Sequence, residues 1–201
     1  MFTGIIQAVG VVAAVDKKGE DARLGIHAGD LDLSDVGLGD SIACNGVCLT
    51  VVELAPAGFS VDVSAETFRC SAGFPAGAAV NLEKAMRLAD RLGGHLVSGH
   101  VDGVGEVLRF VPVGDCFELV IRAPDDLARF IVTKGSITVN GVSLTVNQIN
   151  GADFSINLIP HTLSQTNLEA LQQGGKVNLE VDMMARYAER ILNYYQETKA
   201  I

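Results

Sequence analysis

Residues 45–51 read NGVCLTV and residues 140–146 read NGVSLTV, so seven residues recur with one change, Cys48 to Ser143. Extending the comparison to residues 41–51 and 136–146 gives eight identities in eleven positions at an offset of 95 residues. The same offset pairs Gly4 with Gly99 and Thr67 with Thr162. With two more residues inserted, VNLE at 80–83 recurs at 177–180. The chain is therefore two copies of one unit, and the second begins near residue 94.

Each copy has the pattern of an all-β unit. Stretches such as GFSVDVS (58–64), DFSINLI (153–159), VLRFV (107–111), CFELVIRA (116–123) and KVNLEV (176–181) are alternating or β-branched, and Gly, Asn and Asp separate them. About six such strands in a unit of this size favour closure into a small barrel, which removes exposed edges. Asn45-Gly46 predicts a two-residue hairpin turn that places Cys44 opposite Val47 and Ala43 opposite Cys48.

The two copies end differently. KAMRLADRLGG (84–94) predicts a short helix stopped by two glycines. At the C-terminus an apolar stripe at helical spacing comprises Met184, Tyr187, Ala188, Ile191, Leu192 and Tyr195. This helix either folds back on its own barrel or joins chains into an oligomer. We divide the chain into a first barrel with its connecting helix (1–93), a second barrel (94–182) and a C-terminal oligomerisation helix (183–201).

Composition and motifs exclude several classes of function. The formal charge of −9, from 24 acidic and 15 basic residues, argues against nucleic acid as a partner. No apolar run is long enough for a membrane span, and the N-terminus lacks the pattern of a signal peptide. The four cysteines are expected to be reduced thiols in a cytoplasmic protein. No zinc motif, phosphate-binding loop or complete dinucleotide fingerprint is present, so no metal site is expected.

Three local features remain as candidates for chemistry. GGHLVSGH (93–100) carries His95 and His100 beside glycines; on a strand the two would face opposite ways, so that one is structural and one functional. Cys48 and Thr50 share a strand face, as do Ser143 and Thr145, which suits hydrogen bonding to a planar heterocycle. Thr67 and Thr162 each begin a short helix, either as a cap only or as a ligand contact.

MFTGI (1–5), NGVCLTV, GGHLVSGH, TKGSITVNGVSLTV (133–146) and IPHTL (159–163) together resemble the α-subunit type of riboflavin synthase. The resemblance runs from Met1 to about Asp182. It implies two six-stranded Greek-key barrels, each binding one 6,7-dimethyl-8-ribityllumazine, and a homotrimer held by the C-terminal helix. The implied reaction transfers four carbons between two lumazines and yields riboflavin and 5-amino-6-(ribitylamino)uracil, without a metal or cofactor. The implied active site pairs the first barrel of one chain with the second barrel of a neighbour.

The resemblance also implies the residues of each pocket. The first set is Gly4, Ile5, Ile6, Cys48, Leu49, Thr50, Asp62, Val63, Ser64, Ala65, Glu66 and Thr67. The second set is Gly99, His100, Val101, Lys134, Ser143, Leu144, Thr145, Asn157, Leu158, Ile159, Pro160, His161 and Thr162.

The expected roles follow from the chemistry of the reaction. The acidic 7-methyl group of the donor lumazine needs a base, for which His100 is the candidate. Ser143 and Thr145 would orient the ring and stabilise negative charge, and Cys48 would donate a hydrogen bond or add to an electrophilic carbon. Asp182 resembles an acid of the family. Differences between the copies, Cys48 against Ser143 and Ile5 against His100, would assign donor and acceptor.

Three alternatives remain open from the sequence. A non-catalytic lumazine- or flavin-binding protein is the nearest, although such proteins tend to lose the motif of one half, and here both halves keep Leu-Thr-Val. A flavin-reductase-type barrel would need an R-x-Y-[ST] element, which is absent. A structural β-barrel adaptor would have no use for repeated polar strand faces.

Overall fold

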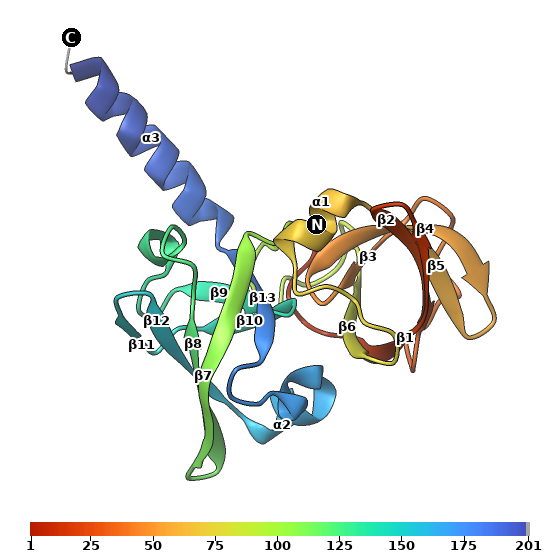
Figure 1. The fold of residues 1–201 in the computed structure, drawn as a ribbon. Helices are drawn as coiled ribbons and strands as arrows, with labels where there is room; N and C mark the ends of the chain where they lie inside the picture. The colour runs from red at the N-terminus through yellow and green to blue at the C-terminus, as the bar shows by residue number, and fades with distance from the viewer. Residues whose placement is uncertain (200–201) are drawn as a thin grey trace.

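A computed structural model describes residues 1–199 as two β-sheet units and a C-terminal helix that projects from the second unit (Figure 1). The elements of the first unit are β1 (Ala8–Lys18), β2 (Asp21–His27), β3 (Ser41–Cys44), β4 (Val47–Ala55), β5 (Gly58–Val63), α1 (Ala65–Cys70) and β6 (Ala79–Lys84). Its strands close into a barrel in the order β1-β2-β5-β4-β3-β6, around a core that includes Leu24, Ile42 and Val61. The predicted six-stranded barrel is confirmed for this copy.

The second unit repeats this order with one strand broken. Its elements are β7 (Gly103–Val113), β8 (Cys116–Arg122), the 3-10 helix η1 (Ala128–Phe130), β9 (Ser136–Val139), β10 (Val142–Thr145), β11 (Gln148–Asn150), β12 (Asp153–Leu158), α2 (Pro160–Gln165), η2 (Asn167–Ala170) and β13 (Lys176–Val181). They form one seven-stranded sheet in the order β10-β9-β13-β7-β8-β12-β11.

The end strands of this sheet, β10 and β11, are consecutive in the chain and together occupy the place of β4. The second copy therefore keeps the six strand positions of the first, with the fourth position divided into β10 and β11. The break falls at Val146-Asn147, and the equivalent position in β4 is a bulge between Val51 and Glu53. In the first copy the bulge only bends β4. In the second copy the irregularity at the same position divides the strand into β10 and β11.

Both Asn-Gly turns adopt the predicted hairpin geometry. Asn45 and Gly46 have φ values of 48° and 81°, and Asn140 and Gly141 have 48° and 80°. β3 and β4 pair Cys44 with Val47 and Ala43 with Cys48, as the sequence predicted. The two turns also face each other, because a Cβ built on Gly46 would lie 2.8 Å from the backbone nitrogen of Gly141. A larger residue at this turn would therefore push the two barrels apart.

The segment after β6 is not the helix predicted for residues 84–94. The N–H groups of Ala85 and Met86 donate to the carbonyl oxygens of Ser41 (3.0 Å) and Met1 (2.8 Å), rather than to residues four positions back. The Asp90 carboxylate accepts from the backbone N–H of Arg87 at 2.8 Å and pairs with its guanidinium. These long-range bonds and this turn hold the segment extended where isolated helical propensity is weak.

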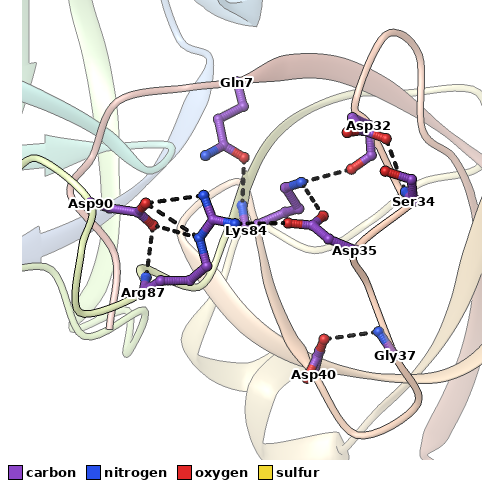
Figure 2. A network of polar contacts seen from close by, with 9 residues as sticks. All are labelled: Gln7, Asp32, Ser34, Asp35, Gly37, Asp40, Lys84, Arg87 and Asp90. Carbon is purple, nitrogen blue, oxygen red and sulfur yellow. Dashed lines mark hydrogen bonds and ion pairs between the residues drawn. The ribbon is translucent and has the colours of Figure 1, made fainter.

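A polar network fastens this segment to the loop before β3 (Figure 2). The Lys84 side chain donates to the carbonyl oxygen of Asp32 at 2.8 Å and pairs with Asp35 at 2.6 Å. Arg87 pairs with Asp35 at 3.3 Å, and the backbone N–H of Lys84 donates to Gln7 at 3.0 Å. The end of β6 is therefore held on both sides.

The C-terminal helix α3 (Met183–Lys199) does not fold back on its barrel (Figure 1). Met184, Tyr187, Ile191, Leu192 and Tyr195 are each 55–66% exposed. Ion pairs of Arg186 with Asp102 and of Arg129 with Glu189 fasten its base. The alternative of a helix packed against its own barrel is therefore wrong for this chain. No helix within residues 1–199 is long and apolar enough to cross a membrane.

Candidate functional site

The two polar strand faces lie at equivalent places in the two units. On β4, Cys48 is half-buried and Thr50 is exposed; on β10, Ser143 is half-buried and Thr145 is exposed. The leucine between them points to the interior in each copy, as Leu49 is buried and Leu144 packs against the second core. Each unit therefore presents two short polar side chains from one rigid strand, as the sequence predicted.

A corner from strand to helix stands beside each polar face. Pairing of Val51 with Val61 places Thr50 at the level of Asp62, where β5 leads into α1. Ser64, not Thr67, caps α1, because its hydroxyl accepts from the N–H of Thr67 at 3.3 Å. In the second copy Ile159 precedes α2, and Pro160 supplies its first turn. The reading of the two threonines as helix caps was therefore wrong.

The short segments that complete each pocket cross between the barrels. The Gly4 carbonyl accepts from the N–H of Ser143 at 2.7 Å, and Ile6 packs against the core of the second barrel. In the equivalent contact of the other copy, the Gly99 carbonyl accepts from the N–H of Cys48 at 2.8 Å, and Val101 packs against the first core. The assignment of each segment to the pocket of its own copy was therefore wrong.

This exchange regroups the expected binding residues into two sets, which we name the first pocket and the second pocket; that either set binds a ligand is part of the proposal below. The first pocket comprises Cys48, Leu49, Thr50, Asp62, Val63, Ser64, Ala65, Glu66, Thr67, Gly99, His100 and Val101. The second pocket comprises Ser143, Leu144, Thr145, Asn157, Leu158, Ile159, Pro160, His161, Thr162, Lys134, Gly4, Ile5 and Ile6. Sequence offset could not show the exchange, because it relates residues without saying which barrel a loop contacts.

The serine of the second pocket has a histidine partner. His95 Nδ1 lies 2.7 Å from Ser143 Oγ, and the tautomer decides which of them donates. Gly94 makes this approach possible, since a Cβ there would lie 2.1 Å from the carbonyl oxygen of Thr3 and 2.7 Å from Ser143 Cβ. Burial lowers the pKa of His95 below its ordinary value, and the Asp182 carboxylate partly offsets this. A neutral imidazole beside a hydroxyl can accept its proton.

His100, the candidate base, lies instead at the first pocket. Its backbone follows Gly99, which is bonded to Cys48, and its N–H donates to the hydroxyl of Ser98 at 3.2 Å. The His100 side chain is exposed. The expectation that it joins Ser143 and Thr145 in one pocket of one chain was therefore wrong. The sequence had singled out both histidines, and the paired glycines before His95 were the signal for its role.

Asp182 lies between the second barrel and α3. Its carboxylate accepts from the N–H of Met184 at 2.9 Å and so caps the helix, and it lies close enough to His95 to raise the pKa of that imidazole. The expected acid is thus placed near the Ser143–His95 pair. Its own bonds are to the helix.

Lys134 holds an unusual backbone conformation in the second pocket. Its φ is 66°, whereas the equivalent residue of the first copy is Gly39 with φ 92°. The N–H of Lys134 donates to the carbonyl oxygen of Val146 at 2.8 Å, next to the end of β10. A lysine in the left-handed region costs conformational energy that a glycine would avoid, which points to a use for its ammonium group.

Charge also distinguishes the two pockets. Asp62 pairs with Arg23 at 2.8 Å, whereas its counterpart Asn157 lies opposite Glu118. The Arg23 guanidinium lowers the pKa of Asp62. Glu66 in α1 is replaced in α2 by His161. The two pockets therefore occupy equivalent places in the repeat and differ in charge.

Two cavities lie next to these pockets. One of about 870 Å³ opens beside Ile5, with walls from the loop before β3 and from the segment after β6. Another of about 710 Å³ lies beside Ala65 and Phe68 of α1. Within residues 1–199 no group of three or more His, Cys, Asp or Glu side chains is arranged to hold a metal ion.

Comparison with known proteins agrees with this duplicated architecture. The model of the lumazine binding domain matches residues 3–85 and 98–182. The chain is 47% identical to riboflavin synthase of Photobacterium leiognathi over 96% of its own length and 89% of that protein. It is 41% identical to riboflavin synthase of Bacillus amyloliquefaciens, over 100% of this chain and 94% of that protein.

Solved structures also resemble this chain in their fold. The structure of LumP complexed with riboflavin superposes with a TM-score of 0.84 at 29% identity, covering 90% of this chain and 99% of that one. LumP complexed with 6,7-dimethyl-8-(1'-D-ribityl) lumazine gives a TM-score of 0.79 at 30% identity, with the same coverage.

Proposed function

The chain belongs to the lumazine-binding riboflavin synthases, and from that membership we propose how its two unlike pockets carry out the reaction. The enzyme is a transferase that converts two molecules of 6,7-dimethyl-8-ribityllumazine to riboflavin and 5-amino-6-(ribitylamino)uracil. The two products together contain all the atoms of the two substrates. The observation that carries the proposal is the pair of equivalent pockets that differ at Cys48 and Ser143.

We assign each lumazine to one pocket. The polar pairs Cys48–Thr50 and Ser143–Thr145 would bond the carbonyls and ring nitrogens, and the adjacent corners of strand and helix would receive the ribityl chains. Holding two rings together can supply much of the acceleration, since well-oriented reactants gain on the order of 7–11 kcal/mol.

We propose that the reacting pair forms between chains. Three chains would associate through the exposed stripe of α3, and the first pocket of one chain would face the second pocket of its neighbour. His100 of one chain would then approach Ser143 and Thr145 of the next, although they belong to different pockets of one chain. Trimer formation would in this way complete the active site. The domain limits 1–93, 94–182 and 183–201 belong to the same proposal.

The proton steps use the groups in these pockets. His100, as base or proton shuttle, would take the proton from the 7-methyl group of the donor lumazine, leaving an anion spread over the ring system. The Ser143 hydroxyl, oriented by His95, would stabilise the negative charge. Cys48 would either donate a hydrogen bond to an oxygen or nitrogen of the acceptor or add transiently to one of its electrophilic carbons. Lys134 would add positive charge at the second pocket. The free thiols suit a reducing cytoplasm.

A turnover assay tests the function directly. Purified protein incubated with ribityllumazine in the presence of a chelator should form one riboflavin for every two lumazines consumed, followed by fluorescence and by chromatography of both products. Binding of the lumazine without any product would instead indicate a ligand-binding protein.

A further inference from the structure

The repeated VNLE segment has no part in either pocket. It forms the last strand of each barrel, β6 and β13, and its asparagine and glutamate are buried in both copies. The asparagines join the barrels: Asn81 donates to the carbonyl oxygen of Asn140 at 3.0 Å, and Asn178 donates to that of Asn45 at 2.8 Å. The buried carboxylates of Glu83 and Glu180 still need an explanation.

Glu180 holds the segment that carries His100. Glu180 is buried, with only 4% of its surface exposed. One carboxylate oxygen accepts from the N–H and hydroxyl of Ser98 at 2.7 and 2.8 Å, and the other accepts from the N–H of Gly99 at 3.0 Å. The Ser98 hydroxyl in turn accepts from the N–H of His100 at 3.2 Å. A carboxylate with three donors from one short segment fixes that segment closely.

Glu83 repeats these contacts on the segment that carries Ile5. It is 3% exposed and accepts from the N–H and hydroxyl of Thr3, both at 2.7 Å, and from the N–H of Gly4 at 3.0 Å. The Thr3 hydroxyl accepts from the N–H of Ile5 at 3.2 Å. Burial raises the pKa of both glutamates, while the donated hydrogen bonds act in the opposite direction.

Each held segment serves the pocket of the other barrel. Gly99, held by Glu180 of the second barrel, bonds Cys48 of the first, and Gly4, held by Glu83 of the first barrel, bonds Ser143 of the second. The positive φ of Gly99, 82°, and the 2.6 Å from its built Cβ to Cys48 Cβ leave no room for another residue at this crossing. The glutamate is therefore linked to a pocket outside its own barrel by one short segment.

The strands that bear the glutamates are themselves fixed. The residue after Glu83, Lys84, donates its backbone N–H to Gln7 at 3.0 Å, and the residue after Glu180, Val181, donates to Asp102 at 2.7 Å. Gln7 and Asp102 are equivalent by the offset of 95 residues. Asp102 also pairs with Arg186 of α3, so that the base of the helix and the His100 segment share one anchor.

We propose that Glu83 and Glu180 are positioning residues that act across the barrels: Glu180 sets the His100 segment over the first pocket, and Glu83 sets the Ile5 segment over the second. This inference rests on the proposed function for the identity of the ligand. It predicts that replacing the glutamate of one barrel weakens ligand binding in the pocket of the other barrel.

Glutamine variants test the proposal with little change in shape. In Glu180→Gln or Glu83→Gln one arm of the side chain becomes an NH₂ group, which faces backbone N–H donors and cannot accept from them. Ser98→Ala and Thr3→Ala are milder variants that remove only the hydroxyl contact to the same carboxylate. Thermal unfolding shows which of the four variants remain folded, and the milder pair supplies the test where a glutamine variant does not fold.

The measurement is riboflavin binding resolved by pocket in the full chain. The γ2-methyl groups of Thr50 and Thr145, labelled with ¹³C and assigned with Thr→Ser variants, report on the first and second pockets. We expect Glu180→Gln to weaken riboflavin binding at the Thr50 signal by at least about tenfold and leave Thr145 within threefold of the wild type, and Glu83→Gln to do the reverse. The alanine variants should show the same preference to a smaller degree.

Three outcomes would overturn the proposal: weakening confined to the pocket of the substituted barrel, equal weakening of both pockets, or no weakening in any folded variant. The wild-type titration separates these from failure of the proposed function, because a wild-type chain that binds riboflavin at neither signal would contradict the function and not the positioning role.

Discussion

Two opposing effects act on the pKa of the His95 imidazole. Its pKa is lowered by burial against Ser143 and is partly restored by the Asp182 carboxylate. The folded state therefore disfavours the charged imidazole relative to the unfolded chain, whose histidine titrates near 6.5. Above that pH the imidazole is neutral in both the folded and the unfolded chain, so its titration does not change the free energy of unfolding. As the pH falls below about 6.5 and through the lowered pKa of the folded state, the unfolded chain takes up the proton first, and the free energy of unfolding decreases.

The first prediction concerns this titration. Between about pH 7.5 and about pH 5 the free energy of unfolding of the wild type should fall more steeply than that of His95→Asn, because only the wild type takes up a proton here on unfolding. Urea denaturation at each pH measures the difference. The NMR titration midpoint of His95 should lie below about 6.5; a midpoint at or above that value would contradict the assigned environment.

The second prediction concerns the strained Lys134. Lys134→Gly should raise the free energy of unfolding by about 0.5–1 kcal/mol, since relief of the left-handed conformation outweighs the added freedom of the unfolded chain. The same variant should bind ribityllumazine several-fold more weakly at the second pocket, because the ammonium group is lost.

Gly39→Ala is the matched control for Lys134→Gly. A Cβ at Gly39 meets no heavy atom within 4 Å, so only the φ of 92° opposes it, and it should destabilise by about 1 kcal/mol. Denaturation and ligand titration of both variants check the pair. A Lys134→Gly protein that is less stable than the wild type, with binding unchanged, would show that the lysine has a structural use instead.

At the scale of elements, the strands and hairpin turns followed from local pattern. Asn-Gly at 45–46 fixed the register of β3 and β4 to the residue, and alternation located β5, β8, β12 and β13. The exchange of Gly4 and Gly99 between barrels did not follow, because it depends on how two finished barrels meet. The segment 84–94 was misread for the same reason: its partners, Met1 and Ser41, are distant in the chain.

The third prediction tests the joint between the barrels. Asn178→Ala removes the donor to the carbonyl oxygen of Asn45 and the acceptor for the N–H of Ala72, two part-buried hydrogen bonds. Leaving two such groups unpaired should lower the free energy of unfolding by roughly 2–4 kcal/mol. Asn193→Ala, at an exposed position of α3, should change stability by less than about 0.5 kcal/mol. Denaturant melts of both variants give the comparison, and equal effects would remove the special role of the joint.

At the scale of the whole molecule, the exposed stripe of α3 is the feature that a single chain leaves unexplained. Ile191→Glu places a charge on the stripe and should reduce self-association and turnover together, whereas Asn193→Glu, on the opposite side of the helix, should alter neither. Sedimentation velocity and the turnover assay, run on the same samples, check this fourth prediction. A dissociated Ile191→Glu protein with full turnover would show that one chain suffices for catalysis.

The proposal that the active site lies between chains has a sharper test in mixed oligomers. Thr50→Arg should plug the first pocket and Thr145→Arg the second, at positions related by the internal repeat. Neither variant alone should turn over lumazine, because every site in its trimer would contain one plugged pocket. Coexpressed chains with two different tags allow the mixed trimers to be isolated and assayed.

In any mixed trimer with head-to-tail contacts, one junction joins an intact first pocket to an intact second pocket. Each mixed trimer should therefore recover about one third of the wild-type activity, and a random mixture about one quarter. If both lumazines instead react within one chain, every chain in the mixture carries a plugged pocket and no activity returns. The assay thus distinguishes a site shared by neighbours from a site closed within one chain, because the barrels and their ligands are the same in both cases and only their pairing differs.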